Sequence, residues 1–553
     1  MNTDTHRFKN GQTEARNPCR FLLLSVSICV YLWIILLSSC STKPTDMRTL
    51  VPAETLVYLE TNDLAAALQP IVDAKPFKDV AKSKPDFSAL KGVQLAVAVT
   101  GFETSEEKLT DEHSVGRVQP HFVAVADTHA WNYQAVAFAE KKLGGFVADI
   151  YDSEPTLERS DKHGGKYFIW TAADGRKAYA LVIDSIIYFG NDESAIDKFL
   201  AVKRGEADGV AKAGKVKPAS QETLASGYVS TDGVAQIANI VGLQFASQAS
   251  EESEVQSAIA GILPQLIRNS VKDITWTSTK TEHGIEDKWS VTMADDISRV
   301  FNETVVSDPS SEKQRLVADG ILSRIPSDVE SVTRYNLKSP QVAWRSALLV
   351  SQSRLDAIGS NIVGIISNGL FEPYGIQDPV LFLSSLGGKP DRIPNIITVR
   401  MDADSDESVL LSMSGDQGLT QKSLVKDMKP PRYGEDGYSW WSTLDGDTDI
   451  DFERGLITMG PAEQVKKIRL HRGAQVPDTL RLMAESDAPI VTVGRDHGTI
   501  LQLIDMFARE GHGDTQAVST YLTETRFTKS GMERKTTSDF GLIGAIIAQL
   551  GQD

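Results

Sequence analysis

The densest set of potential ligands in the sequence is the acidic segment DGDTDIDFE at 445–453. If this segment is a strand, its alternation places every second residue on one face, and that face carries the carboxylates of Asp445, Asp447, Asp449 and Asp451. Four like charges on one face repel one another, so they need water or a cation. The segment departs from a calcium-binding loop, because Ile450 occupies the position that requires glycine and Leu456 that of the bidentate glutamate. We therefore predict a solvated acidic hairpin and no bound metal, with a divalent cation at these aspartates as the alternative.

The other residues that could carry chemistry do not form a catalytic pattern. The histidines lack the His-Glu-x-x-His spacing of a zinc site, although His121 and His129 flank a predicted strand end near Asp127. No Gly-x-Ser-x-Gly motif surrounds a serine, and the Ser-x-x-Lys sequences stand without their partner motifs. A glycine-rich phosphate-binding loop is also missing from the sequence. We therefore predict no catalytic residue and no cofactor, and leave the ligand-binding residues unassigned.

One cysteine has a predicted chemical role. Residues 1–20 are basic and 21–37 form an almost unbroken apolar run, which together are typical of an export signal. The run ends in Leu37-Ser38-Ser39-Cys40, which resembles the bacterial lipobox and implies cleavage before Cys40 and lipid transfer to its thiol. The alternative is an uncleaved membrane anchor, because the apolar run is nearly long enough to span a bilayer. Both interpretations place the bulk of the protein outside the cytoplasmic membrane, in the bacterial cell envelope.

The cysteine count supports export. The other two cysteines, Cys19 and Cys29, lie in the signal segment, so the mature chain would contain no disulfide and no thiolate metal site. Ser41 follows the lipidated cysteine in place of the aspartate that is associated with inner-membrane retention. We therefore expect the outer membrane, if the host has one. The predicted partners are the membrane, through the lipid at Cys40, and an envelope protein or polymer.

Composition narrows the class of protein further. The chain has 553 residues, too many for one small core, so two or more domains are expected. Its 41% hydrophobic and 24% charged residues are ordinary for a folded soluble protein and exclude a disordered or multi-pass membrane protein. The 74 acidic and 57 basic residues give a formal charge of −17, which argues against nucleic acid as a partner.

The part after the signal contains a diverged internal repeat. Pro52 and Asn62 recur as Pro326 and Asn336, in each case 274 residues later. Further blocks recur in the same order: 167–175 as 438–446, 190–205 as 460–473, 227–242 as 492–507, and the stretch around Gly284 as that around Gly531. This order predicts a tandem duplication. The predicted parts are a lipoprotein signal peptide (1–39), a tether (40–48), repeat unit 1 (49–305), a linker (306–320) and repeat unit 2 (321–553).

Local patterns indicate what each unit contains. Alternating or apolar runs predict strands at 57–62, 94–102 and 121–127, and the polar segment 103–120 is expected to be a surface loop. Asp-Gly pairs at 174–175 and 445–446 predict hairpin turns, as do His283-Gly284 and Ser530-Gly531. Helices are predicted between the strands, for example where Ile500, Leu503, Ile504 and Phe507 follow helical spacing. The predicted fold class is α+β, with two related units that each form an antiparallel sheet of hairpins with packed helices.

The opening strand and one later block resemble a known family. Pro52, Thr55 and Tyr58 form a Pro-x-x-Thr-x-x-Tyr pattern, and a Tyr…Gly block runs from Tyr167 to Gly190. Both features are similar to those of an uncharacterised family of bacterial exported proteins, known as a domain of unknown function. The resemblance implies an exported lipoprotein and assigns no activity, substrate or catalytic residue.

Three classes of function remain open. The first is a non-enzymatic envelope lipoprotein that acts as a binding or scaffold protein, which we favour. The second is a carrier of a small or lipidic ligand, which an apolar pocket in each unit would support. The third is an unrecognised envelope enzyme, which a polar cleft with convergent carboxylates of shifted pKa would support.

Overall fold

The fold was analysed in a computed structural model of the chain. It describes residues 44–108, 114–151, 153–218, 222–249, 264–306, 320–355, 396–403, 408–413, 432–433, 438–442, 446–453, 456–471, 475–508 and 518–550, with short pieces at 220, 262, 360 and 382–384. The export signal, Cys40, Asp445 and most of the predicted linker lie outside these residues.

Within the described residues, twenty antiparallel strands form one sheet. The first ten are β1 (Val57–Thr61), β2 (Gln94–Lys108), β3 (Ser114–Asp127), β4 (Thr156–Lys162), β5 (Gly165–Thr171), β6 (Lys177–Ile183), β7 (Ile186–Gly190), β8 (Thr223–Ser230), β9 (Val271–Thr281) and β10 (Gly284–Met293). The second ten are β11 (Ser331–Tyr335), β12 (Ile396–Arg400), β13 (Ser408–Met413), β14 (Arg432–Tyr433), β15 (Tyr438–Ser442), β16 (Thr448–Glu453), β17 (Leu456–Pro461), β18 (Ile490–Asp496), β19 (Ser519–Thr528) and β20 (Gly531–Ser538).

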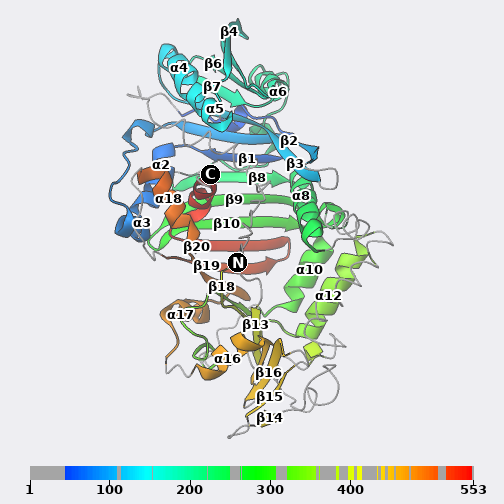
Figure 1. Ribbon diagram of the computed structural model, residues 1–553. Helices are drawn as coiled ribbons and strands as arrows, with labels where there is room; N and C mark the ends of the chain where they lie inside the picture. Colours follow the sequence, from blue (N-terminus) through cyan, green and yellow to red (C-terminus); the bar gives the residue numbers. More distant parts are fainter. Residues whose placement is uncertain are drawn as a thin grey trace, which may run out of the picture.

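The pairings give the order of the strands across the sheet. From one edge to the other it is β4-β5-β6-β7-β3-β2-β1-β8-β9-β10-β20-β19-β18-β11-β12-β13-β17-β16-β15-β14. At the centre β10 pairs with β20, from Ile285 opposite Ser538 to Thr292 opposite Gly531. The prediction of antiparallel sheet with packed helices is confirmed. The two sheets predicted from the sequence are joined into one continuous sheet, however, because the backbone N–H and C=O groups of β10 and β20 form hydrogen bonds with each other (Figure 1).

Most predicted turns are present, but one predicted loop is wrong. Gly175, after Asp174, has a φ of +89° in the turn between β5 and β6, a backbone conformation that glycine adopts without strain. His283-Gly284 likewise connects β9 to β10. The segment 103–120, expected to be a surface loop, continues β2 to Lys108 and starts β3 at Ser114. Its polar side chains suggested a loop, but the cross-strand backbone pairing extends along it regardless of side-chain polarity.

Helices lie on both sides of the sheet and at its ends (Figure 1). In the N-terminal half they are α2 (Leu64–Asp73), α3 (Lys75–Val80), α4 (Asn132–Phe138), α5 (Gly144–Tyr151), α6 (Glu193–Lys203), α7 (Val210–Ala213), α8 (Thr231–Ala249) and α10 (Asp295–Thr304). In the C-terminal half they are α12 (Pro340–Ser353), α16 (Ala462–Leu470), α17 (Asp478–Glu485), α18 (Gly498–Ala508) and α19 (Gly541–Leu550). A π-helical turn, η3 (Ala139–Leu143), joins α4 to α5, and short 3-10 turns occupy Met47–Thr49 (η1) and Ser88–Leu90 (η2).

The largest core contains residues from both ends of the chain. Helices α2 and α3 pack with α18 and α19 over the central strands, as Figure 1 shows. Ile500, Leu503 and Ile504 are buried in this core, which confirms the predicted apolar face of that helix. The ring of Phe507 lies 6.4 Å from that of Phe77 and 5.6 Å from that of Phe87, both edge to face. The beginning and the end of the chain are therefore held together by direct side-chain packing.

The fold begins earlier than the tether predicted at 40–48 would allow. Met47 lies in η1 and is only 1% exposed. It packs in a second core with Tyr58 and Tyr188, on the opposite face of β1 and β2 from the largest core. Thr45 and Met47 therefore belong to the folded part, which shortens any tether to the residues just after Cys40.

The contact between the two ends of the chain can be measured by a double-mutant cycle. We expect Phe77→Ala to lower the free energy of unfolding by about 3–5 kcal/mol, because it empties a buried aromatic site. Combined with Phe507→Ala, the effects should be non-additive by about 0.5–1.5 kcal/mol, since each substitution removes the other ring's partner. Urea denaturation of the chain beginning at Ser41 measures both quantities. Leu482→Ala, an exposed position in α17, is the control and should add independently to Phe77→Ala; additivity of the Phe77 and Phe507 changes would contradict the packing.

Candidate functional site

A buried polar cluster fixes the N-terminal end of the fold. Gln94 at the start of β2 and Asp127 at the end of β3 are opposite each other in the sheet and are 1% and 3% exposed. The Thr45 backbone N–H donates to Gln94 Oε1 (2.8 Å), and Gln94 Nε2 donates back to the Thr45 carbonyl (2.7 Å). The Thr45 hydroxyl donates to Asp127 Oδ2 (2.6 Å). Three hydrogen bonds thus attach Thr45 to the ends of two sheet strands. We call Thr45, Gln94 and Asp127 the N-terminal clamp.

His129 and Ser185 support the carboxylate of the clamp. The backbone N–H of His129 donates to Asp127 Oδ1 (3.0 Å), and its Nδ1 lies 3.4 Å from the same oxygen. His129 Nε2 lies 3.2 Å from Gln94 Oε1. The Ser185 hydroxyl donates to Asp127 Oδ1 (2.9 Å). An aspartate that ends an apolar strand therefore accepts bonds from three segments of the chain, which satisfies its buried charge.

This combination of serine, histidine and aspartate differs from a nucleophilic triad. In such a triad the hydroxyl donates to the histidine, which the aspartate orients. Here the Ser185 hydroxyl donates to Asp127 itself. The cluster therefore orders the chain around Asp127 and does not activate the serine.

The acidic segment is buried, which corrects the prediction of a solvated hairpin. In β16 the side chains of Asp449 and Asp451 are 11% and 5% exposed, and Glu453 continues the same face of the strand. Asp447 precedes the strand and is exposed, and Asp445 lies outside the described residues. The alternation was predicted correctly, but α16 covers this face of β16 and β17.

Arginines supply the positive charge near these carboxylates. Arg469 of α16 places Nη1 3.5 Å from Asp451 Oδ1 and 4.0 Å from Asp449 Oδ2. Arg324 forms an ion pair with Glu453, and the Ser442 hydroxyl donates to Asp449. Within the described part of the chain, no three or more His, Cys, Asp or Glu residues are arranged to hold a metal ion. The guanidinium groups therefore occupy the place that the sequence suggested for water or a cation.

A single buried carboxylate lies at the centre of β1. Glu60 is 3% exposed and accepts hydrogen bonds from the Tyr58 hydroxyl (2.7 Å) and the Ser226 hydroxyl (3.1 Å). Burial raises the pKa of Glu60 above its ordinary value, and the two hydrogen bonds oppose the shift. Glu60 lines neither the pocket beside Phe146 nor the one beside Arg469. Its hydrogen bonds to Tyr58 and Ser226 account for its burial within the sheet.

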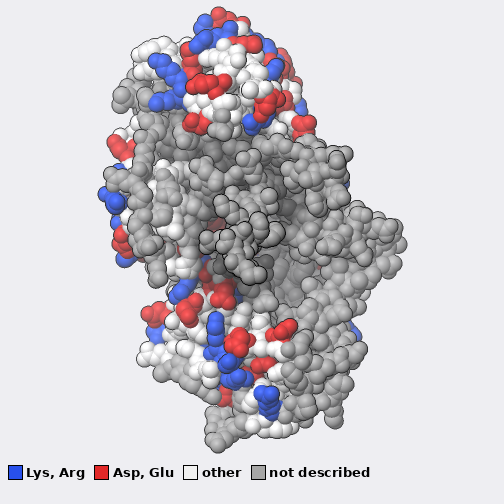
Figure 2. All heavy atoms as spheres, viewed as in Figure 1, with Lys and Arg blue, Asp and Glu red and all other residues white. Residues whose placement is uncertain are grey.

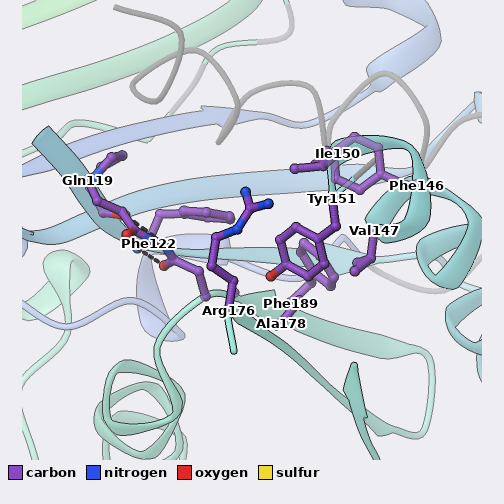
Figure 3. A pocket seen from close by; sticks show the side chains of 12 residues that line it. Gln119, Phe122, Phe146, Val147, Ile150, Tyr151, Arg176, Ala178 and Phe189 are labelled. Carbon is purple, nitrogen blue, oxygen red and sulfur yellow. Dashed lines mark hydrogen bonds between the residues drawn. The ribbon is translucent and has the colours of Figure 1, made fainter. Parts of the chain in front are cut away.

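An apolar pocket lies between α5 and the strands β3, β6 and β7 (Figure 3). Phe146, Ile150 and Phe189 line its wall, and the guanidinium of Arg176 lies over the ring of Tyr151 at 4.6 Å. Burial raises the pKa of Tyr151 to about 12, so its hydroxyl stays protonated at neutral pH. The accessible volume is about 50 Å³. This is room for a few water molecules, whereas small-molecule sites usually measure about 300–1,000 Å³.

Comparisons with known proteins return no relative. The chain matches no protein-family model, no curated protein and no solved structure. Among the residues that the structure describes, no helix has the length and apolarity needed to cross a membrane. The site must therefore be interpreted from its own geometry.

Sequence analysis found some of these residues and missed others. Asp127 and His129 were noted as neighbours at a strand end, and the structure brings them together. Gln94 and Thr45 were missed, since nothing local marks residues that meet only through tertiary contact. Arg469 was also missed, although its spacing in the helix after β17 places it over the sheet. Trp170 of β5 is 2% exposed and packs on Phe168 in the core.

The ion-pair cluster can be tested by removing its cation. We expect Arg469→Met to lower the free energy of unfolding by about 3 kcal/mol, because Asp449 and Asp451 stay buried without their counter-charge. Adding Asp451→Asn should restore part of the loss. Lys466→Met, on the exposed side of the same helix, is the control and should change the free energy by less than about 0.5 kcal/mol. Urea titration with EDTA or with calcium gives a second readout, and a calcium-dependent rise in wild-type stability would show that the aspartates bind a cation.

The buried carboxylate makes stability depend on pH in a defined direction. Because the pKa of Glu60 is raised in the folded protein, the carboxyl stabilises the fold while protonated and loses that contribution as pH rises through its folded pKa. Glu60→Gln cannot ionise, so its free energy of unfolding relative to wild type should increase as the pH rises above the ordinary pKa of a glutamate. Glu463→Gln, at an exposed position, is the control. Parallel stability curves for wild type and Glu60→Gln would contradict the assignment.

Proposed function

We propose that the protein is a cell-envelope lipoprotein, anchored through Cys40, that acts as a non-enzymatic binding or scaffold protein. The observation that carries this proposal is the N-terminal clamp, which holds Thr45 by three hydrogen bonds five residues after Cys40. A fully extended chain of five residues spans at most about 18 Å. A folded body attached so closely to its lipid remains next to the membrane surface and is held in a restricted range of orientations.

The sheet is suited to presenting a rigid body. Its twenty strands are hydrogen-bonded continuously, and its two edges are poorly suited to adding further strands. Edge strand β4 exposes Glu158, Arg159 and Asp161, and the described part of edge strand β14 exposes Arg432 and Tyr433. In Figure 2 the described residues near β4 show basic and acidic side chains side by side. These features favour discrete binding over open-ended polymerisation.

The same geometry supports a tandem duplication. Strands β1–β10 pair in the order 4-5-6-7-3-2-1-8-9-10, and β11–β20 in the corresponding order from the opposite edge. Gly284 begins β10 and Gly531 begins β20. When the residues opposite each other are followed from these glycines across the neighbouring strands, Glu60 of β1 corresponds to Arg334 of β11. These residues are 274 apart, the separation at which Pro52 recurs as Pro326. The agreement of an alignment made from sequence with one made from strand register supports two units of one topology.

A carrier function is the alternative. The pocket beside Phe146 has apolar walls and a cation at its mouth, Arg176, which would suit an apolar ligand with an acidic group. Its volume of about 50 Å³ is too small for an acyl chain without movement of α5. The geometry therefore favours the scaffold over the carrier. Because Ser41 follows Cys40, we expect attachment to the outer membrane if the host has two membranes.

The anchor is tested by Cys40→Ala. The variant should lose labelling by palmitate and accumulate as an uncleaved precursor, whereas wild type should fractionate with the outer membrane of a double-membraned host. Labelling of the variant equal to wild type would contradict the anchor. Solvent extraction of the purified wild type, followed by mass spectrometry, separates scaffold from carrier. A non-covalent ligand at roughly one per protein, lost when Ala178→Trp fills the pocket, would favour the carrier.

A further inference from the structure

We propose that Trp131 and Tyr133 form a membrane-contact surface that inserts into the bilayer interface beside the lipid anchor. We call these two side chains the aromatic pair. The proposal rests on the lipid anchor at Cys40 proposed above, and it adds a second point at which the protein touches the same membrane.

The aromatic pair is exposed although the helix that carries it is well packed. Trp131 and Tyr133 are 66% and 69% exposed. Trp131 immediately precedes α4. Its backbone N–H donates to Gln134 Oε1 (3.2 Å), and this bond fixes the start of the helix. The inward face of α4 is occupied by Ala135 and Phe138, both buried. The fold therefore does not need the aromatic pair for its core, and both side chains are available for contact with a partner.

The clamp places the aromatic pair next to the point where the chain leaves the fold. Asp127, which binds the Thr45 hydroxyl, lies four residues before Trp131. The backbone turns sharply between them, because His129 has a φ of +50° and donates its N–H to Asp127. Four residues span at most about 14 Å, and the five from Cys40 to Thr45 at most about 18 Å. The two limits add to about 32 Å, so the clamp keeps the lipid and Trp131 in the same region of the protein whatever path residues 40–44 take.

The chemistry of the surface fits a bilayer interface. Tryptophan and tyrosine prefer the headgroup level of a membrane, where the ring is apolar and the N–H or O–H remains hydrated. The residue between the two aromatic side chains is polar: Asn132 lies beside the β6–β7 turn, with Nδ2 3.4 Å from the Asp184 carbonyl. The formal charge of −17 argues against attraction to anionic lipid as the source of the contact. Insertion of the aromatic rings supplies the contact instead, and such a contact should be insensitive to salt.

The other end of the sheet offers a matched control. Tyr433 on edge strand β14 is 72% exposed, about as much as the aromatic pair. Figure 1 shows β14 and α4 at opposite ends of the molecule. A membrane contact at the aromatic pair should therefore leave Tyr433 in water.

The test uses the full lipoprotein in vesicles. Trp131→Cys, Tyr133→Cys and Tyr433→Cys are each labelled with the fluorophore NBD; the acylated Cys40 is the mature chain's own cysteine, so the introduced thiol alone reacts. The proteins are reconstituted into phosphatidylcholine vesicles that contain a nitroxide-labelled lipid. We expect NBD emission at 131 and 133 to fall by roughly half or more, at low and high salt alike, and emission at 433 to stay unchanged.

The outcomes separate the two proposals. Intact mass without acyl groups would overturn the anchor, and with it the membrane-contact surface. An acylated protein bound to vesicles with unquenched probes at both 131 and 133 would overturn the aromatic contact alone. Cross-linking of position 131 to a second copy of the chain, without quenching, would assign the surface to self-association and overturn the membrane contact.

Discussion

The pairing of β10 with β20 is the interaction on which the rest of the structure depends. Without it each strand would be a free edge in the middle of the molecule, with unpaired N–H and C=O groups. Beside it, the buried Asp287 of β10 accepts hydrogen bonds from the Trp276 indole (3.1 Å) and from the Leu542 backbone N–H (2.6 Å), at the first turn of α19. Burial raises the pKa of Asp287, and these bonds oppose that rise. The same residue thus joins the sheet to the helix that closes the largest core.

Once the two halves share a sheet, their helices are brought onto each other. Helix α19 packs on α2, and α10 packs on α12, so the helix that follows each central strand contacts the helix after the first strand of the other half. Neither contact could form if the halves were separate bodies on a flexible linker. The scaffold that carries the N-terminal clamp therefore depends on strands near the opposite end of the chain.

Two helix-covered faces of the sheet are filled in different ways. In the N-terminal half Leu181 and Phe199 pack in an apolar core between β6 and α6. The residues 270 positions later, Asp451 and Arg469, form the ion-pair cluster between β16 and α16. The same separation relates Gly190 to Gly460, at which an added Cβ would approach a carbonyl oxygen of the next strand in both cases. The space between a helix and the sheet can thus be filled by an apolar or by a charged interface, provided that each buried charge has a partner.

The sequence by itself determined the local features of this protein. Alternation and glycine turns predicted β1, the hairpins at Gly175 and Gly284 and the apolar face of α18, because these depend on residues close together in the chain. The repeat offsets and the lipobox-like Cys40 were also visible there and remain predictions. The tertiary structure alone decided that the strands join in one sheet, that Asp449 and Asp451 face Arg469, and that Thr45 binds Gln94 and Asp127. These partners are 18 to 82 residues apart, and such pairs are selected by the shape and charge of the whole fold, which no local pattern encodes.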